Sequence, residues 1–269
     1  MTMSTFTQPE KPVLPLEKMT ALLPEAAQAY ATASPFPHTH FDDFFDAAVV
    51  DGVLKEFPGE NDIDWISYYD GNQKKLANER EENMGPFTRH VLHSLNSPAF
   101  LKFLEALTGI QGLIADPTFR GGGLHNIYRG GKLGIHADFN KHTKLNLERR
   151  LNLLLYLNKD WKEEYGGHIE LWDKGMTHCV KRYLPIFNRV VIFTTTDLSF
   201  HGHPDPLLCP TTTSRKSLAL YYYSEGRPEE ETSDKHSTLF KLRPGEKVES
   251  GLALKAQKLL RRVSTKIKS

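Results

Sequence analysis

Cysteine is scarce in this sequence, since only Cys179 and Cys209 occur among its 269 residues. Two cysteines cannot build the disulfide framework on which many small secreted proteins depend, and such scarcity suits a reducing cytosol. We interpret both side chains as small core hydrophobes, with a reactive thiol as the alternative for either one.

Long apolar runs are also missing. No stretch approaches the roughly 18 apolar residues that a membrane-spanning helix needs. Residues 1–12 contain no basic segment followed by an apolar one, so they do not resemble a signal peptide. These absences favour a soluble, cytoplasmic protein without a membrane span.

An excess of charge of one sign is the third absence. The chain has 34 Lys and Arg against 33 Asp and Glu, a formal net charge of +1. No global field therefore attracts nucleic acid or an acidic polymer, and we expect no nucleic-acid partner. The hydrophobic fraction of 39% is ordinary for a globular protein, and a chain of this length can bury a sizeable core.

Helical spacing of apolar residues dominates the first part of the chain. Leu16, Met19, Leu22 and Leu23 predict a helix in an N-terminal extension, which we place at residues 1–35. A second amphipathic stretch is predicted over residues 36–57. A third helix is predicted over residues 98–108, and Gly109 should end it. Between the last two, residues 64–89 show no regular period.

The pattern changes to that of strands after Gly109. Residues 149–158 alternate, with four leucines on one face and Asn152, Leu154 and Tyr156 on the other. Residues 190–195 and 217–223 also predict strands, and glycine pairs separate such segments. Short strands with frequent turns predict a sandwich or jelly roll, within a main domain at residues 36–226.

Residues 227–269 form a third region with a different composition. It begins with an acidic run at residues 229–231 and becomes basic towards its end. An apolar stripe at helical spacing lies beneath that basic charge, formed by Leu252, Ala256, Leu259, Leu260, Val263 and Ile267. We expect a terminal helix docked on the main domain, with a partner-binding or membrane-surface helix as the alternative.

A candidate metal site is the most informative motif. His136 and Asp138 are two residues apart after a predicted turn, so on a strand both side chains face one side. The pair alone is a weak signal, but His201 follows the predicted strand at residues 190–195. Two histidines and one carboxylate form the facial triad that suits iron(II) and leaves open coordination positions. Arg215 could bind a dicarboxylate co-substrate through its planar fork, and Ser217 would lie on the same face.

The remaining histidines have simpler interpretations. His203 is a rival for the third ligand position. His125, His168 and Trp172 could contact substrate, although structural roles are the default for all three. We expect five further histidines to face solvent: His90, His93, His142, His178 and His236.

Four segments in a fixed order resemble the prolyl-4-hydroxylase-like Fe(II)/2-oxoglutarate-dependent oxygenases. They are NIYRGGKLGIHAD at residues 126–138, RLNLLLYLNKDW at residues 150–161, GGHIELW at residues 166–172, and residues 199–223 with their His, Arg-x-Ser and tyrosine-rich strand. The resemblance covers roughly residues 36–226. Two departures are a longer spacing before Arg215, with residues 209–213 inserted, and a long polar loop at residues 140–148.

This resemblance implies a mainly β double-stranded β-helix with supporting N-terminal helices. It implies that His136, Asp138 and His201 bind Fe(II) and that Arg215 binds the distal carboxylate of 2-oxoglutarate. It further implies that Tyr128 and Tyr156 line the co-substrate pocket, beside Ser217. The implied activity is a dioxygenase that consumes O2, with ascorbate as a candidate reductant, and hydroxylates a small molecule or an amino-acid or peptide-type substrate.

Two alternatives stay open at this stage. One is a zinc hydrolase that uses the same three ligands, although the chain lacks a His-Glu-x-x-His motif. The other is a jelly-roll binding protein without catalysis. The sequence leaves the oligomeric state open. The polar segments at residues 64–89 and 140–148 have the character of loops that cover a site and select substrate.

Overall fold

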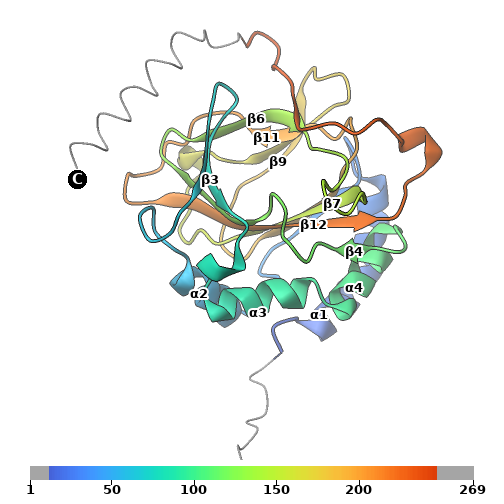
Figure 1. Ribbon diagram of the computed structural model, residues 1–269, viewed down its shortest axis with the longest axis horizontal. Helices are drawn as coiled ribbons and strands as arrows, with labels where there is room; N and C mark the ends of the chain where they lie inside the picture. The colour runs from blue at the N-terminus through green and yellow to red at the C-terminus, as the bar shows by residue number, and fades with distance from the viewer. Residues whose placement is uncertain (1–11, 247–269) are drawn as a thin grey trace, which may run out of the picture.

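The computed structural model describes residues 12–246, which form four α-helices and one extensive β-sheet (Figure 1). The helices are α1 (Leu16–Thr32), α2 (Ala47–Glu56), α3 (Pro86–Leu95) and α4 (Pro98–Thr108), with short 3-10 turns η1 (Glu81–Asn83), η2 (Glu163–Tyr165) and η3 (Glu229–Glu231). The strands are β1 (His38–Phe41), β2 (Ile66–Tyr69), β3 (Gln73–Asn78), β4 (Ile114–Ala115), β5 (Gly123–Tyr128), β6 (Lys132–Ala137), β7 (Glu148–Tyr156), β8 (Ile169–Trp172), β9 (Cys179–Tyr183), β10 (Val190–Thr194), β11 (His201–His203), β12 (Ser214–Ser224) and β13 (Leu239–Phe240).

The strands run in the order β1-β10-β7-β12-β5-β3-β6-β11-β8-β9, and β13, β2 and β4 pair with β6, β3 and β12 respectively. Figure 1 shows the sheet curling so that β6, β11 and β9 lie opposite β7 and β12, with all four helices on the outer side of the β7–β12 layer. The predicted double-stranded β-helix with supporting N-terminal helices is confirmed.

The main core lies between this layer and the helices. Strand β7 contributes Leu151, Leu153 and Leu155, all fully buried, and Leu157 continues the row directly after the strand. Across the interface, α4 contributes Phe100 and Leu104. The predicted alternation is therefore confirmed from Leu151 to Leu157, because alternate side chains of a strand reach opposite faces. It is wrong at the start of β7, where a register shift against β12 turns Arg149 to the cavity side with Asn152.

Helix α4 has the predicted bounds. Gly109 follows its last turn with φ of +75°, and its backbone N–H donates to the carbonyl of Glu105. Residues with a side chain rarely adopt this left-handed conformation, so glycine ends the helix at little cost.

The predictions for residues 36–57 and 64–89 are partly wrong. The first segment begins as β1, which pairs with β10, and becomes helical only at α2, where Asp46 accepts a hydrogen bond from Ala48 N–H. The second contains the β2–β3 hairpin and the start of α3. Charged side chains on β3 hide its period, although β3 joins β5 to β6 in the centre of the sheet order.

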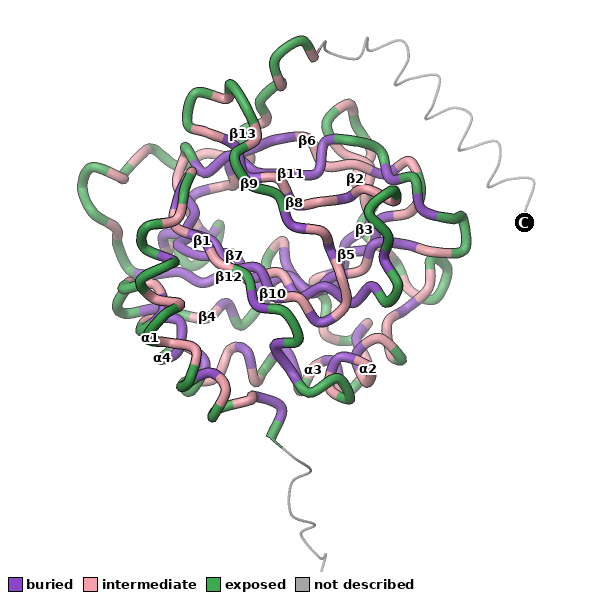
Figure 2. The backbone as a smooth tube through the Cα atoms, turned by 180° about the vertical axis from the view of Figure 1, so that it is seen from behind, coloured by how far each residue is buried: buried purple, intermediate pink, exposed green. Residues whose placement is uncertain are grey.

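Residues after 226 continue along the domain. Strand β13 pairs with β6, at Phe240↔His136 and Leu239↔Ala137, and Figure 2 shows it beside β6. The amphipathic helix predicted from Leu252 to Ile267 lies outside the described residues, as do residues 1–11. Within residues 12–246, no helix is long and apolar enough to cross a membrane.

Candidate functional site

A cavity of about 610 Å³ lies inside the curled sheet. His136, Asp138 and His201 line it together with Arg215 and Ser217. Strands from both layers contribute, because β6 and β11 carry the histidines and β12 carries the other pair. The fold thus collects five of the seven residues predicted for the site around one space.

The three candidate metal ligands converge. β6 and β11 pair with His136 opposite His201, and Asp138 follows the end of β6. Each residue offers one ligand atom within 4.8 Å of the others. The carboxylate of Asp138 lies 3.6 Å from His136 Nε2 and 3.3 Å from His201 Nε2.

Backbone contacts orient both imidazoles. His136 Nδ1 lies 2.8 Å from the carbonyl of Gly134, and His201 Nδ1 lies 2.8 Å from that of Ser199. A carbonyl only accepts, so each Nδ1 must carry the proton and each Nε2 keeps its lone pair. Two neutral imidazole nitrogens and a carboxylate are a donor set that fits iron(II).

Asp138 is held by two residues that the sequence analysis missed. Arg149 Nη2 lies 3.1 Å from Oδ2 of Asp138, and Asn152 Nδ2 donates to the same oxygen at 2.7 Å. Burial opposes ionisation, yet the Arg149 guanidinium holds the pKa of the Asp138 carboxyl well below its usual range. Arg149 itself stacks 3.4 Å from the ring centroid of Tyr221. The signal for Asn152 was available, since it is a polar residue on the non-leucine face of β7.

Arg215 is a buried cation without a carboxylate partner among the described residues. It is 4% exposed, its Nε donates to the carbonyl of Gly167 at 2.8 Å, and its Nη2 donates to Tyr156 Oη at 3.1 Å. A Cβ at Gly167 would lie 3.0 Å from Arg215 Cδ, so glycine is needed for this close approach. None of the ion pairs within residues 12–246 includes Arg215. A guanidinium without a carboxylate partner at the cavity wall suits an anionic ligand.

The two predicted tyrosines have different positions. Tyr156 is fully buried and braces Arg215 with its hydroxyl. Tyr128 is not among the residues that line the main cavity, and its predicted contact with the co-substrate stays a prediction. It lines a second pocket of about 300 Å³ with Lys74 and Arg129, because its side chain leaves β5 on the opposite face from Ile127.

His203 and His125 both line the main cavity and are buried. Neither ring nitrogen of His203 has a hydrogen-bond partner among the described residues. Burial lowers the pKa of His125 to about 3, so this ring is neutral. His203 lies outside the group of converging ligand atoms, which favours His201 as the third candidate ligand.

His168 and Trp172 lie away from the cavity lining. His168 Nε2 is 3.0 Å from Glu163, and Trp172 donates to Glu170. The prediction of a solvent-facing His142 is wrong, because this residue is 1% exposed and lies 3.5 Å from Asp116.

Of the remaining histidines predicted to face solvent, three do so and one does not. His90, His93 and His178 are exposed, as predicted. His236 is half-buried and lines the cavity, so its solvent-facing prediction is also wrong.

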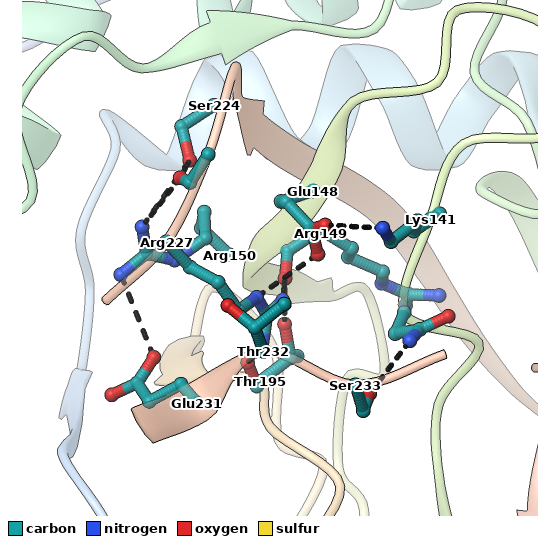
Figure 3. Close-up of polar contacts among 12 residues, drawn as sticks. Lys141, Glu148, Arg149, Arg150, Thr195, Ser224, Arg227, Glu231, Thr232 and Ser233 are labelled. Carbon is teal, nitrogen blue, oxygen red and sulfur yellow. Dashed lines mark hydrogen bonds and ion pairs between the residues drawn. The ribbon is translucent and has the colours of Figure 1, made fainter. Parts of the chain in front are cut away.

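One side of the cavity is built by the strap, by which we mean residues 227–243. Its cavity-lining members are Lys235, His236, Ser237, Thr238 and Phe240. Figure 3 shows how the strap begins: Glu148 binds Lys141 on one side and Arg227 on the other, each at 3.0 Å. Further along, the ring of Phe240 lies 5.4 Å from that of His136. Sequence reasoning missed the strap because nothing in its composition indicates where it docks.

Comparison with known proteins agrees with this geometry. Residues 122–223 match the model of the 2OG-Fe(II) oxygenase superfamily. A segment of 79 residues is 32% identical to prolyl 3-hydroxylase OGFOD1 of Mus musculus and represents 28% of this chain. It spans only 14% of that protein.

Solved structures share the fold. A prolyl-4-hydroxylase from Pseudomonas putida aligns over 75% of this chain and 100% of its own, with a TM-score of 0.51 and 14% identity. A prolyl hydroxylase from Trichoplax adhaerens, in complex with a hypoxia inducible factor peptide fragment, aligns over 78% of this chain and 92% of its own, with a TM-score of 0.52 and 18% identity. The predicted resemblance is confirmed: residues 122–223 match the model of the 2OG-Fe(II) oxygenase superfamily, and the fold is that of the prolyl hydroxylase structures.

Proposed function

We propose that this chain is a 2-oxoglutarate-dependent dioxygenase that hydroxylates an amino-acid, peptide-type or other small substrate. The balanced reaction converts a substrate C–H bond, O2 and 2-oxoglutarate to an alcohol, succinate and CO2. The observation that carries the proposal is the convergence of His136, Asp138 and His201 beside the unpaired cation of Arg215 in one cavity.

His136 and His201 would hold iron(II) through Nε2, and Asp138 through its carboxylate. Bound iron(II) supplies the redox chemistry that activates O2 as 2-oxoglutarate is decarboxylated. Arg149 and Asn152 both contact Oδ2 of Asp138, so the carboxylate keeps one orientation.

Arg215 would bind the distal carboxylate of 2-oxoglutarate. Its Nε and one Nη are already engaged, and these contacts fix the plane of the guanidinium towards the cavity. Ser217, two residues along β12, offers a hydroxyl on the same wall. Because the side chain of Arg215 is already ordered, binding costs less conformational entropy than ordering a mobile arginine would.

Metal content and succinate release test this proposal. We expect the purified chain to bind one equivalent of iron(II) and to release succinate from 2-oxoglutarate slowly in the absence of substrate. A protein that binds zinc, ignores 2-oxoglutarate and hydrolyses test esters or amides would support the hydrolase alternative instead. A protein with neither activity would support the binding-protein alternative.

The prolyl hydroxylases among the similar proteins suggest the first substrates to screen. A panel of free amino acids and short proline-containing peptides, scored by succinate release above the uncoupled rate, would identify the class.

A further inference from the structure

The charges that line the cavity are unequal. Six lining residues are Lys or Arg and two are Asp or Glu: the first group is Lys75, Arg120, Lys141, Arg149, Arg215 and Lys235, and the second is Glu79 and Asp138. Cations so placed must be compensated by carboxylates of the protein, by solvent or by a ligand.

Three of the six cations have carboxylate partners. Arg120 Nη1 lies 2.8 Å from Glu79, Lys141 lies 3.0 Å from Glu148, and Arg149 lies 3.1 Å from Asp138. Both lining carboxylates are thereby used, since Glu79 accepts a second hydrogen bond from Gly121 N–H and Asp138 a second from Asn152.

Lys75, Lys235 and Arg215 remain. Within residues 12–246 none of the three has an ion pair with a carboxylate, and neither lysine ammonium has a hydrogen-bond partner. Arg215 has the distal carboxylate of 2-oxoglutarate as its proposed partner. Two lysines are therefore left over after the co-substrate has been accommodated.

Lys75 lies on β3, in the inner wall of the sheet. Its neighbours at i−2 and i+2, Gln73 and Ala77, pair with Leu133 of β6 and His125 of β5, both of which line the cavity. Lys75 is half-buried, and its ammonium lies 5.1 Å from the ring centroid of Tyr68. Burial lowers the pKa of this ammonium to about 8, and the nearby Arg149 and Arg215 guanidinium groups add to the lowering.

Lys235 approaches from the strap, on a segment that is fixed on both sides. Asn140 Nδ2 donates to the carbonyl of Asp234 at 2.8 Å and to the hydroxyl of Ser233 at 2.9 Å. On the other side, His236 Nε2 lies 2.8 Å from Asp197. The exposed side chain of Lys235 therefore extends from an anchored backbone at the cavity.

We infer that the substrate carries a carboxylate and that Lys75 and Lys235 bind it. This inference rests on the proposed function, and it narrows the substrate class to small anionic molecules such as free amino acids or organic acids. An internal prolyl residue of a peptide has no carboxylate at the reacting unit and would leave both lysines uncompensated. The cavity of about 610 Å³ has room for such a molecule beside the co-substrate.

The test compares matched carboxylates and amides on the full chain loaded with iron(II) and 2-oxoglutarate. The probes are the twenty free L-amino acids and five dicarboxylic acids, each paired with its amide. Two readouts are used: succinate release above the uncoupled rate, and the shift of the thermal midpoint, which is also measured without metal. We expect at least one carboxylate to raise both, and its amide to be at least about tenfold weaker.

Lys75→Met should weaken the response to that carboxylate about tenfold, and Lys235→Met a few-fold, because Lys235 is exposed and screened by solvent. Lys75→Arg should restore most of the response. Lys102→Met, an exposed lysine on α4 away from the cavity lining, is the matched control and should change nothing. A rise in the thermal midpoint of unliganded Lys75→Met is expected as well, because an uncompensated charge has been removed.

Three results would overturn the inference: no carboxylate of the panel acts on the wild-type chain, an amide acts as well as its acid, or the lysine variants respond normally. A fourth is that Lys75→Met loses affinity for 2-oxoglutarate while its response to the panel is unchanged, since the lysine would then serve the co-substrate. Failure of the proposed function is distinguishable, because it would appear as absent iron and 2-oxoglutarate binding in the wild-type chain.

Discussion

The two faces of strand β7 differ in almost every property. The face turned to the helices carries Leu151, Leu153 and Leu155, each fully buried in the main core. The other face carries Asn152, whose amide donates to the candidate metal ligand Asp138, and Tyr156, whose hydroxyl accepts a hydrogen bond from Arg215. One strand therefore contributes to stability through its first face and to the site through its second.

This comparison shows how a rigid strand can serve a polar site. The leucine face fixes the backbone through packing, so the opposite side chains inherit a defined position without contributing much apolar burial themselves. Substitutions on the two faces should then separate into those that lower stability and those that lower ligand binding. If every substitution lowered both stability and ligand binding, the two faces of β7 would not have separate roles.

The largest effect is expected from Asp138→Ala, which removes the only anionic member of the candidate triad. Iron(II) binding and succinate release should fall below detection, because ligands that act as one unit do not fail additively. The fold should survive, because Asp138 lies in the cavity whereas the main core lies on the opposite, leucine face of β7. Metal content and circular dichroism measure the two outcomes.

His203→Ala is the matched control for the triad, because His203 is a buried histidine on the same strand as His201. It should retain iron. Loss of iron in His203→Ala together with its retention in His201→Ala would show that the third ligand has been assigned to the wrong histidine.

The second effect concerns Arg215→Leu. Removing a buried partner of a charged ligand costs on the order of 2–5 kcal/mol, so the affinity for 2-oxoglutarate should fall roughly 30-fold or more. Lysine at this position should restore only part of it, because an ammonium lacks the planar fork. Iron binding should be unchanged. A titration of succinate release against 2-oxoglutarate gives the result, and an unaltered midpoint would move the anchor elsewhere, with Lys216 as the first residue to test.

The site could be predicted from the sequence where local geometry is decisive. The convergence of His136 and Asp138 follows from a spacing of two on a strand, and the two faces of β7 follow from alternation. The resemblance to the oxygenase family identified His201 as the third candidate ligand. Helix α4 was predictable for a similar reason, since Gly109 is a strong local stop signal.

Other parts depend on contacts between segments distant in sequence, which no local pattern records. Arg149 lies directly beside Arg150, yet Arg149 contacts Asp138 whereas Arg150 contacts Ser224 and Glu231. The strap docks through Arg227 and Glu148, 79 positions apart in the chain (227 − 148). The period of β3 was hidden because its inward positions carry Gln73 and Lys75, where an ordinary strand would carry apolar residues.

The third effect comes from the opposite face of β7. Leu153→Ala should lower the free energy of unfolding by about 2–5 kcal/mol, because it leaves a cavity in a fully buried part of the core. Iron and 2-oxoglutarate affinities of the folded protein should stay within about twofold of wild type. Urea denaturation followed by fluorescence, combined with metal titration, tests both halves. A large loss of iron affinity at low urea would show that the two faces are not independent.

The smallest effect is expected on the cavity side of the sheet, from Lys75. Its folded pKa is lowered to about 8 by burial, below the ordinary value of 10.5, so the unfolded chain holds more protons between these two pH values. The destabilisation is therefore fully present below pH 8 and fades as the pH rises towards 10.5. Lys75→Met should unfold at a higher temperature than wild type at pH 7, and the difference should shrink at pH 10, whereas Lys102→Met should show no such trend. Equal thermal midpoints for wild type and Lys75→Met at pH 7 would mean that solvent already compensates this ammonium, and that its position in the wall carries no energetic cost.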